Sequence, residues 1–206
     1  MPYFDPKEHH PRYFYQLFMG SLVPRPVGWV STLHENKKVN LAPMSCFNAI
    51  NTRPPMVMIS IGDQDGQLKH TTQNILREKE CVIHIPQFED LEKVHFSAGH
   101  YDAAESEAEL LGLETMDSIT VKTPSLKASK IRMECTLHSV HDLPTNHVLF
   151  LTITHLYIDD SLIENGVISM DKFSPVARLS GGHYASLGER VHLKKYALSS
   201  DSDKTD

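Results

Sequence analysis

Two short segments combine residue types that suit the binding of a small anionic ligand. The first, residues 39–50, has small and hydroxyl-bearing side chains where a buried strand would normally carry Val and Ile. The second, residues 69–74 (KHTTQN), offers a cation and two hydroxyl groups where a helix is predicted to begin. A helix N-terminus has unpaired N–H groups and a partial positive charge, which together bind phosphate. The two segments therefore predict a cradle for a flat ring and a phosphate group.

The first segment contains a proline that limits how its strand can pair. Pro43 has no N–H to give to a neighbouring strand, so this strand is expected at a sheet edge or distorted. The backbone groups of Ser45, Cys46 and Asn48 would then be free to face the edge of a heterocyclic ring. Two simpler interpretations stay open: an edge strand with a bulge, and a Thr-capped helix with a solvated Lys69.

The spacing of apolar residues predicts the elements that would position these segments. Residues 27–33 and the stretch from residue 39 form a β-hairpin around a polar loop, and residues 56–61 and 81–85 are apolar strands. Helices are expected from Thr71 or Thr72 to about residue 79, over residues 89–97, and over residues 102–111, whose acidic side chains are assigned to a solvated face.

The last third of the chain changes to a period of two. Apolar and polar residues alternate over residues 131–138 and 149–154, which predicts two half-buried strands paired antiparallel. Many strands, few helices and no regular strand–helix alternation favour a closed antiparallel barrel. The fold class is therefore mainly β with peripheral helices, arranged as a single domain.

The domain is expected to span residues 1–198, and residues 199–206 form a polar tail predicted to be disordered. The segment 1–23 belongs to the domain and is rich in aromatic residues. It is interpreted as a packed N-terminal segment. A short amphipathic helix docked on the body and an arm contributed to a partner subunit are the two forms considered for it.

Composition and charge disfavour several classes of function. A formal net charge of −6 and the absence of any Lys or Arg run longer than two residues argue against a nucleic-acid partner. No stretch approaches the roughly 20 apolar residues of a membrane helix, and the start of the chain does not resemble a secretory signal. The three separated cysteines are expected as reduced thiols in a cytoplasmic protein. The thirteen histidines form no H-E-x-x-H pattern, so no metal site is assigned.

Five segments, in order and at matching intervals, resemble the flavin reductase-like family, which includes the flavoredoxins. They are residues 24–32 (PRPVGWVST), 39–49 (VNLAPMSCFNA), 53–58 (RPPMVM), 69–75 (KHTTQNI) and 171–188 (DKFSPVARLSGGHYASLG). The resemblance covers about residues 20–190. It implies an FMN-binding split β-barrel that works as a homodimer, with the flavin near the subunit interface.

The same resemblance implies which residues contact the cofactor. At the phosphate side and ring edge of FMN it places Ser45, Cys46, Phe47 and Asn48. Along the phosphate and the ribityl chain it places Lys69, Thr71, Thr72 and Asn74, and near the ring it places Trp29. For Trp29, a place in the core or at a dimer interface is an equal alternative. No residue is assigned as a catalytic acid, base or nucleophile, because hydride and electron transfer belong to the flavin.

Two positions depart from the family pattern: His70 stands where Asp is common, and His84 stands where Asn is common. The sequence has no strand-linked G-x-G-x-x-G fingerprint, so NADH or NADPH would stack transiently on the flavin without a Rossmann site of its own. The expected function is an NAD(P)H-dependent flavin reductase or a flavoredoxin-type electron carrier with an unknown acceptor. The alternatives are an FMN carrier or sensor without turnover, and a barrel that serves as a non-catalytic interaction module.

Overall fold

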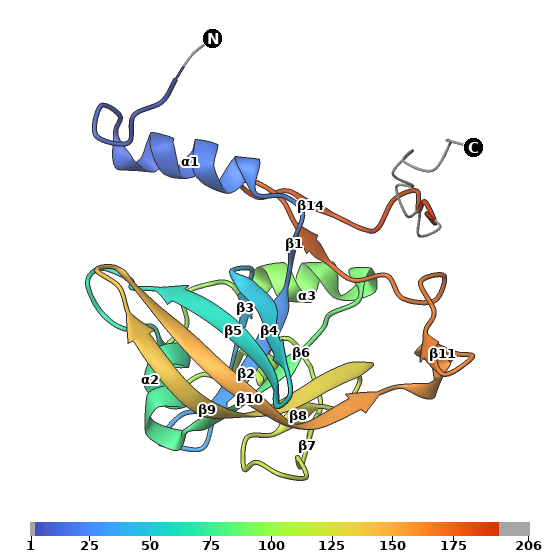
Figure 1. Ribbon diagram of the computed structural model, residues 1–206. Helices are drawn as coiled ribbons and strands as arrows, with labels where there is room; N and C mark the ends of the chain where they lie inside the picture. The colour runs from blue at the N-terminus through green and yellow to red at the C-terminus, as the bar shows by residue number, and fades with distance from the viewer. Residues whose placement is uncertain (1–2, 194–206) are drawn as a thin grey trace, which may run out of the picture.

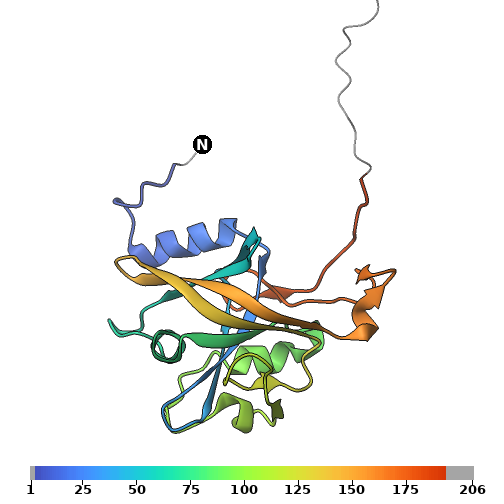
Figure 2. The same ribbon diagram turned by 60° about the horizontal axis from the view of Figure 1, so that its bottom comes forward.

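The computed structural model describes residues 3–193 and is dominated by one antiparallel sheet of seven strands. The strand order is β3-β2-β6-β9-β10-β5-β4. Its strands are β2 (Gly28–Leu33), β3 (Val39–Met44), β4 (Phe47–Thr52), β5 (Pro55–Gly62), β6 (Glu80–His84), β9 (Ile131–Asp142) and β10 (Asn146–Ile158). Figures 1 and 2 show the sheet curling into a barrel around the long β9–β10 hairpin.

The barrel is split between its two edge strands. β3 and β4 lie at opposite ends of the sheet order, yet only residues 45 and 46 separate them in the chain. The two edges of the sheet must therefore meet at this bend, although no ladder joins β3 to β4 in the described part of the chain. The expected mainly β, antiparallel split barrel is confirmed, and so is the edge position of the strand that carries Pro43.

Short elements decorate the barrel. The helical elements are α1 (Pro11–Ser21), α2 (His70–Glu78), η1 (Phe88–Asp90), α3 (Leu91–Phe96), α4 (Glu107–Leu110) and η2 (Asp160–Leu162). The remaining strands are two-residue pieces: β1 (Arg25–Pro26), β7 (Thr115–Met116), β8 (Ser125–Leu126), β11 (Ile163–Glu164), β12 (Val167–Ile168), β13 (Ala177–Arg178) and β14 (Tyr184–Ala185). β13 pairs with both β1 and β14, so the C-terminal part of the chain returns to the N-terminal part.

Strand β2 separates two apolar clusters because successive residues of a strand point to opposite faces. Val30 packs inside the barrel with residues such as Ile59 and Leu149, whereas Trp29 packs outside it with Leu41 and residues of α3 and α4. All six residues of β2 are buried. Strand β2 therefore has no solvated face, and its pairing with β3 holds the start of the bend at Ser45 against the body of the protein.

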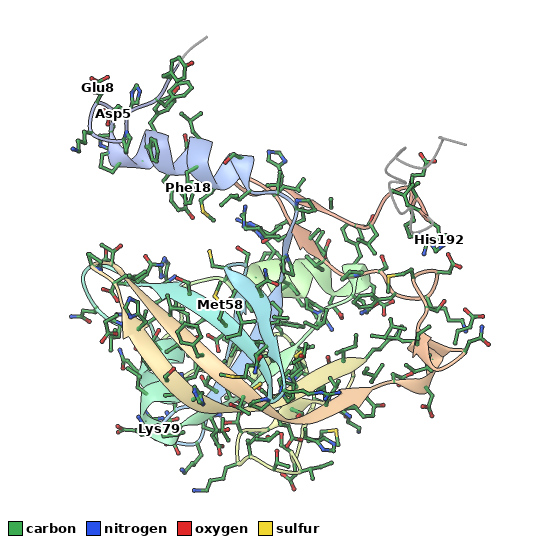
Figure 3. All side chains as sticks on the ribbon, viewed as in Figure 1. Asp5, Glu8, Phe18, Met58, Lys79 and His192 are labelled. Atoms are coloured by element: carbon green, nitrogen blue, oxygen red, sulfur yellow. The ribbon has the colours of Figure 1, made fainter. Side chains whose placement is uncertain are left out.

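Helix α1 differs from the other elements because none of its residues is buried in the described structure. In Figure 1 it lies beyond one end of the barrel, and Figure 3 shows Phe18 on it with the side chain clear of the sheet. The predicted N-terminal segment thus contains a helix, but one with little contact to its own body. The predicted disordered tail, residues 199–206, lies outside the described residues, as do residues 194–198 of the predicted domain.

Two local expectations were wrong. The acidic helix expected over residues 102–111 is only α4, and its Glu107 is 5% exposed instead of solvated. The Glu107 carboxylate accepts a hydrogen bond of 2.8 Å from the backbone N–H of Leu41. It supplies the acceptor that edge strand β3 lacks on its open side. Helix α2 also begins two or three residues earlier than expected, because its N-cap position is Lys69 and not Thr71 or Thr72.

Candidate cofactor-binding cleft

The bend between β3 and β4 is held by three kinds of contact. Ser45 Oγ accepts a hydrogen bond from Arg25 Nε at 3.5 Å, and the Cys46 carbonyl accepts one from Ser60 N at 2.8 Å. The Phe47 ring is buried against Gly28, where a Cβ would lie only 3.3 Å from the ring. A side chain at residue 28 would press on this ring, so Gly28 allows Phe47 to pack closely at the start of β4.

The N-terminus of α2 faces the same region. Lys69 precedes the helix in extended conformation without a capping side chain, and the first turn carries no acidic residue. The first N–H groups of a helix have no partner within it, so this end of α2 presents donors and a partial positive charge. Thr71 is 2% exposed, and its Oγ1 accepts a hydrogen bond of 3.1 Å from Asn40 Nδ2.

Two adjoining cavities form one cleft over Pro43, Lys69 and Ala98, which line both. The α2 lobe has a volume of about 420 Å³ and is lined by residues that include Asn40, Ala42, His70, Thr71 and Tyr101. The arginine lobe has a volume of about 560 Å³ and is lined by residues that include Arg12, Tyr15, Arg25, Ser45 and Arg178. A ligand that contacts Lys69 can therefore extend in either direction.

The structure brings together three of the nine predicted cofactor-binding residues in this cleft. They are Ser45, Lys69 and Thr71. The other six do not line either lobe in the described structure: Cys46, Phe47, Asn48, Thr72, Asn74 and Trp29. Cys46 adjoins the bend but is half-buried, and Asn48 is exposed on β4.

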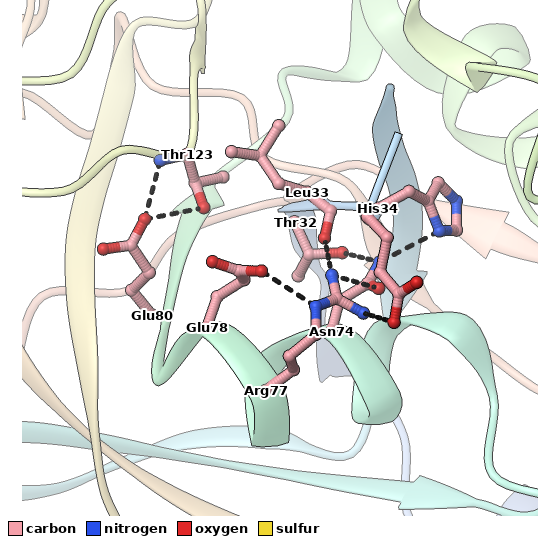
Figure 4. A network of polar contacts seen from close by, with 9 residues as sticks. Thr32, Leu33, His34, Asn74, Arg77, Glu78, Glu80 and Thr123 are labelled. Carbon is pink, nitrogen blue, oxygen red and sulfur yellow. Dashed lines mark hydrogen bonds and ion pairs between the residues drawn. The ribbon is translucent and has the colours of Figure 1, made fainter. Parts of the chain in front are cut away.

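Asn74 and Thr72 lie beneath α2 instead of in the cleft. Asn74 Nδ2 donates to Thr32 Oγ1 at 3.0 Å, and its Oδ1 accepts from Arg77 at 3.1 Å (Figure 4). Its amide therefore ties α2 to β2. Thr72 is 1% exposed, and its Oγ1 has no hydrogen-bond partner within the described residues. Trp29 is also a core residue, since its indole N–H donates to Ser97 Oγ at 2.8 Å.

The two histidines that depart from the family pattern have different surroundings. His70 lines the α2 lobe and meets the ring of His34 edge-on, with centroids 5.0 Å apart. His84 is fully buried, and its Nε2 accepts a 2.9 Å hydrogen bond from Leu126 N. Its Nδ1–H therefore donates to the Trp29 carbonyl at 2.8 Å. Burial lowers the pKa of His84 to about 4, so it is a neutral structural residue at pH 7.

Sequence reasoning missed the arginines of the cleft. The Arg25 guanidinium donates to the carbonyls of Met19, Leu22 and Leu179, which joins α1 and the C-terminal segment to the bend. Arg178 lies over the ring of Tyr184 at 4.4 Å. Both arginines are within the segments that resemble the family, but their convergence depends on the pairing of β1 with β13, which no local pattern reveals.

Other kinds of site find little support among residues 3–193. The described residues contain no group of three or more His, Cys, Asp or Glu side chains placed to hold a metal ion. Within the same range, no helix combines the length and the apolar character needed to cross a membrane. The described fold is an antiparallel split barrel, and the cleft at its split is lined by Lys69 and by the first residues of α2.

Comparison with known proteins identifies the family. A family model described as "Flavin reductase like domain" matches residues 19–177, so the chain belongs to the flavin reductase-like family. An uncharacterized protein of Aquifex aeolicus (strain VF5) is 35% identical over 182 residues, covering 87% of this chain and 93% of its own.

Solved structures agree with the family over nearly the whole chain. Nitrilotriacetate monooxygenase component B from Bacillus cereus superposes with a TM-score of 0.91 at 31% identity, covering 94% of this chain and 98% of its own. Pseudomonas fluorescens 2-nitrobenzoate 2-nitroreductase NbaA superposes with a TM-score of 0.86 at 26% identity, covering 96% and 98% of the two chains. The protein is therefore similar to oxidoreductases and to a monooxygenase component, and its family is one of flavin oxidoreductases.

Proposed function

We propose that the protein is an FMN-binding oxidoreductase that takes electrons from NADH or NADPH and passes them to an acceptor. The observation that carries this proposal is the meeting of the β3–β4 bend and the α2 N-terminus in one cleft. Lys69 and the N–H groups of the first turn of α2 suit a phosphate dianion. The backbone at Pro43 and Met44, on an edge strand, suits the edge of the flavin ring.

The donors present in the α2 lobe fit FMN as a resident group. Thr71 and Asn40 form a fixed pair of polar side chains beside Lys69, and the lobe joins the arginine lobe so that the cofactor has an open face. Bound FMN would supply the hydride and electron chemistry. The residues of this chain would bind the phosphate, orient the ring and leave room for the donor, and none is proposed as a general acid or nucleophile.

The first experiment measures FMN binding to the purified protein by flavin absorbance and fluorescence. We expect the protein to bind FMN and Lys69→Ala to weaken binding about tenfold or more, because a charge-assisted hydrogen bond contributes about 1.5–3 kcal/mol. Lys122→Ala is the matched control, since it removes an exposed lysine that lines neither lobe. Equal FMN binding by the wild type and Lys69→Ala would show that the phosphate assignment is wrong.

The second experiment separates a reductase from its alternatives. The FMN-loaded protein is mixed anaerobically with NADH or NADPH, and the flavin band is followed. Bleaching with turnover on added acceptor supports the reductase or electron carrier. A flavin that stays oxidised identifies a carrier or sensor without turnover, and a protein that binds no flavin identifies an interaction module.

We also propose that the protein works as a homodimer in the cytoplasm. The dimer is supported by α1, a helix with exposed aromatic residues and little contact to its own barrel. The cytoplasmic location is supported by Cys46, Cys81 and Cys135, which are all free thiols.

A further inference from the structure

The arginine lobe contains more positive charge than one FMN phosphate requires. Its charged lining residues are Arg12, Arg25, Lys69 and Arg178, and no carboxylate lines it within the described residues. The α2 lobe, in contrast, is lined by Asp65 and Glu107 as well as by cations. The two lobes thus differ in electrostatic character, and a polyanionic ligand is favoured in the arginine lobe.

The four cations do not have equal freedom to bind a ligand. Arg25 already donates to three carbonyl groups and to Ser45, so it acts as a structural residue of the lobe wall. Lys69 is assigned to the FMN phosphate by the proposed function. Two guanidinium groups remain. Arg178 donates one N–H to the Gly181 carbonyl and lies over the Tyr184 ring, which leaves its other N–H groups for a ligand. The Arg12 side chain is exposed and has no hydrogen-bond or ion-pair partner within residues 3–193.

One face of α1 completes this lobe. Arg12, Tyr15, Gln16 and Met19 all line it, and residues spaced three and four apart lie on the same side of a helix. Tyr15 is 60% exposed and offers a flat ring within one helical turn of Arg12. A planar base stacked on Tyr15 would therefore place an attached phosphate within the range of the arginines.

On this basis, and resting on the proposed function, we propose that the arginine lobe binds the adenosine 2′-phosphate portion of NADPH. Arg12 and Arg178 would bind the phosphate, and Tyr15 would contact the adenine. In Rossmann sites, a carboxylate on the ribose 2′-hydroxyl selects the unphosphorylated dinucleotide, whereas an arginine accommodates the 2′-phosphate. The same preference of guanidinium groups for phosphate applies to this lobe, although it has a different fold. Since the arginine lobe has arginines and no described carboxylate, the protein prefers NADPH to NADH.

The test uses two small probes, adenosine 2′,5′-bisphosphate and AMP, titrated calorimetrically into the full chain with and without FMN. We expect the bisphosphate to bind at least about tenfold more tightly than AMP, as a charge-assisted hydrogen bond to the extra phosphate implies. Arg12→Gln should remove most of that difference and leave AMP binding unchanged. Lys7→Gln, which removes an exposed cation from the same N-terminal segment but not from the lobe, should bind both probes as the wild type does.

The outcomes distinguish this inference from the proposed function. Equal affinity for the two probes, or an Arg12→Gln variant that still prefers the bisphosphate, overturns the 2′-phosphate site even if FMN binds. A parallel loss of FMN affinity in Arg12→Gln also overturns it, because the lobe would then hold the flavin phosphate. Failure of FMN to bind contradicts the proposed function alone, since the titration without FMN still decides the lobe. In steady state, kcat/KM should favour NADPH over NADH, and Arg12→Gln should lower that ratio through KM.

Discussion

Neighbouring threonines at the start of α2 show how one residue separates a side chain that lines the cleft from one that lies in the core. Thr71 lines the cleft and accepts a hydrogen bond from Asn40, whereas Thr72 points its unpaired hydroxyl into the interior. Both are almost completely buried, with 2% and 1% exposed. The sequence could assign hydroxyl groups to the start of the helix, but it could not decide which of them faces the ligand.

The same isosteric change at these two positions gives a prediction. Thr71→Val should weaken FMN binding several-fold, because it removes the hydroxyl group that faces the α2 lobe, and it should cost about 1 kcal/mol of stability for the bond to Asn40. Thr72→Val should leave FMN affinity unchanged and stability equal or slightly higher, because a buried hydroxyl without a partner is replaced by a methyl group. Fluorescence titration and urea unfolding measure the two effects. Equal loss of affinity in both variants would contradict the placement of Thr72.

At the scale of the elements, the edge strand β3 depends on α4. Glu107→Ala should lower the free energy of unfolding by about 1–3 kcal/mol, because it leaves the buried Leu41 N–H without its acceptor. Glu107→Gln keeps an acceptor oxygen and should cost less. Urea unfolding of the three proteins checks this order, and amide exchange at Leu41 should accelerate in Glu107→Ala. A Glu107→Ala variant as stable as the wild type would show that the contact does not hold β3.

The barrel strands were predictable because the pattern of neighbouring residues in the sequence reveals them. The burial of α4 was not predictable in this way. The alternation over residues 131–138 and 149–154 identified both strands of the antiparallel β9–β10 hairpin, and Pro43 identified an edge strand. In contrast, acidic residues 102–111 look like a solvated helix in isolation. Glu107 is buried only because Leu41, far away in the chain, needs an acceptor, and such a need is not visible in the spacing of residues.

His84 joins β6, β2 and β8, and its titration gives a pH dependence for their packing. Burial lowers the folded-state pKa to about 4, below the ordinary value of about 6.5, so the unfolded chain binds more protons between these values. The contribution of His84 to the free energy of unfolding is therefore fully present above pH 6.5. It decreases as the pH falls towards 4, by about 3 kcal/mol in total.

The measurement is urea unfolding at several pH values for the wild type and for His84→Gln. The variant should be less stable at pH 7, because glutamine cannot keep both buried hydrogen bonds of His84, one to the Trp29 carbonyl and one from Leu126 N. It should also lose less stability between pH 6.5 and 4, since glutamine does not titrate. Parallel pH profiles for the two proteins would show that His84 is not the group responsible.

At the scale of the whole molecule, the cleft joins parts that are distant in the sequence. Arg25 links the end of α1, the β3–β4 bend and Leu179 through its guanidinium group. The family resemblance indicated the α2 N-terminus, and the first residues of this helix do line the cleft. It could not indicate the arginine lobe, because that lobe exists only when the two ends of the described chain come together.

The proposed dimer follows from the second face of α1. Its aromatic face, defined here as Tyr13, Phe14, Leu17 and Phe18, lies opposite the residues that line the arginine lobe. Tyr13 is 46% and Phe18 is 52% exposed in the single chain. Helices shorter than about 12–15 residues are marginal in water unless a face is packed, and α1 has 11 residues. A second copy of the chain that covers this face would stabilise the helix and hold Arg12 and Tyr15 over the cleft.

Phe18→Asp tests this arrangement. The wild type should have the mass of a dimer by light scattering, and Phe18→Asp should weaken the dimer at least about tenfold, because a carboxylate would be buried in an apolar interface. Ile119→Asp is the matched control: it adds the same charge at a side chain that is 74% exposed in the loop before β8. A monomeric wild type contradicts the dimer, and a Phe18→Asp variant that stays dimeric shows that another surface forms it. If the dimer holds α1 in place, the monomeric variant should also lose its preference for adenosine 2′,5′-bisphosphate over AMP, although residue 18 does not line the arginine lobe.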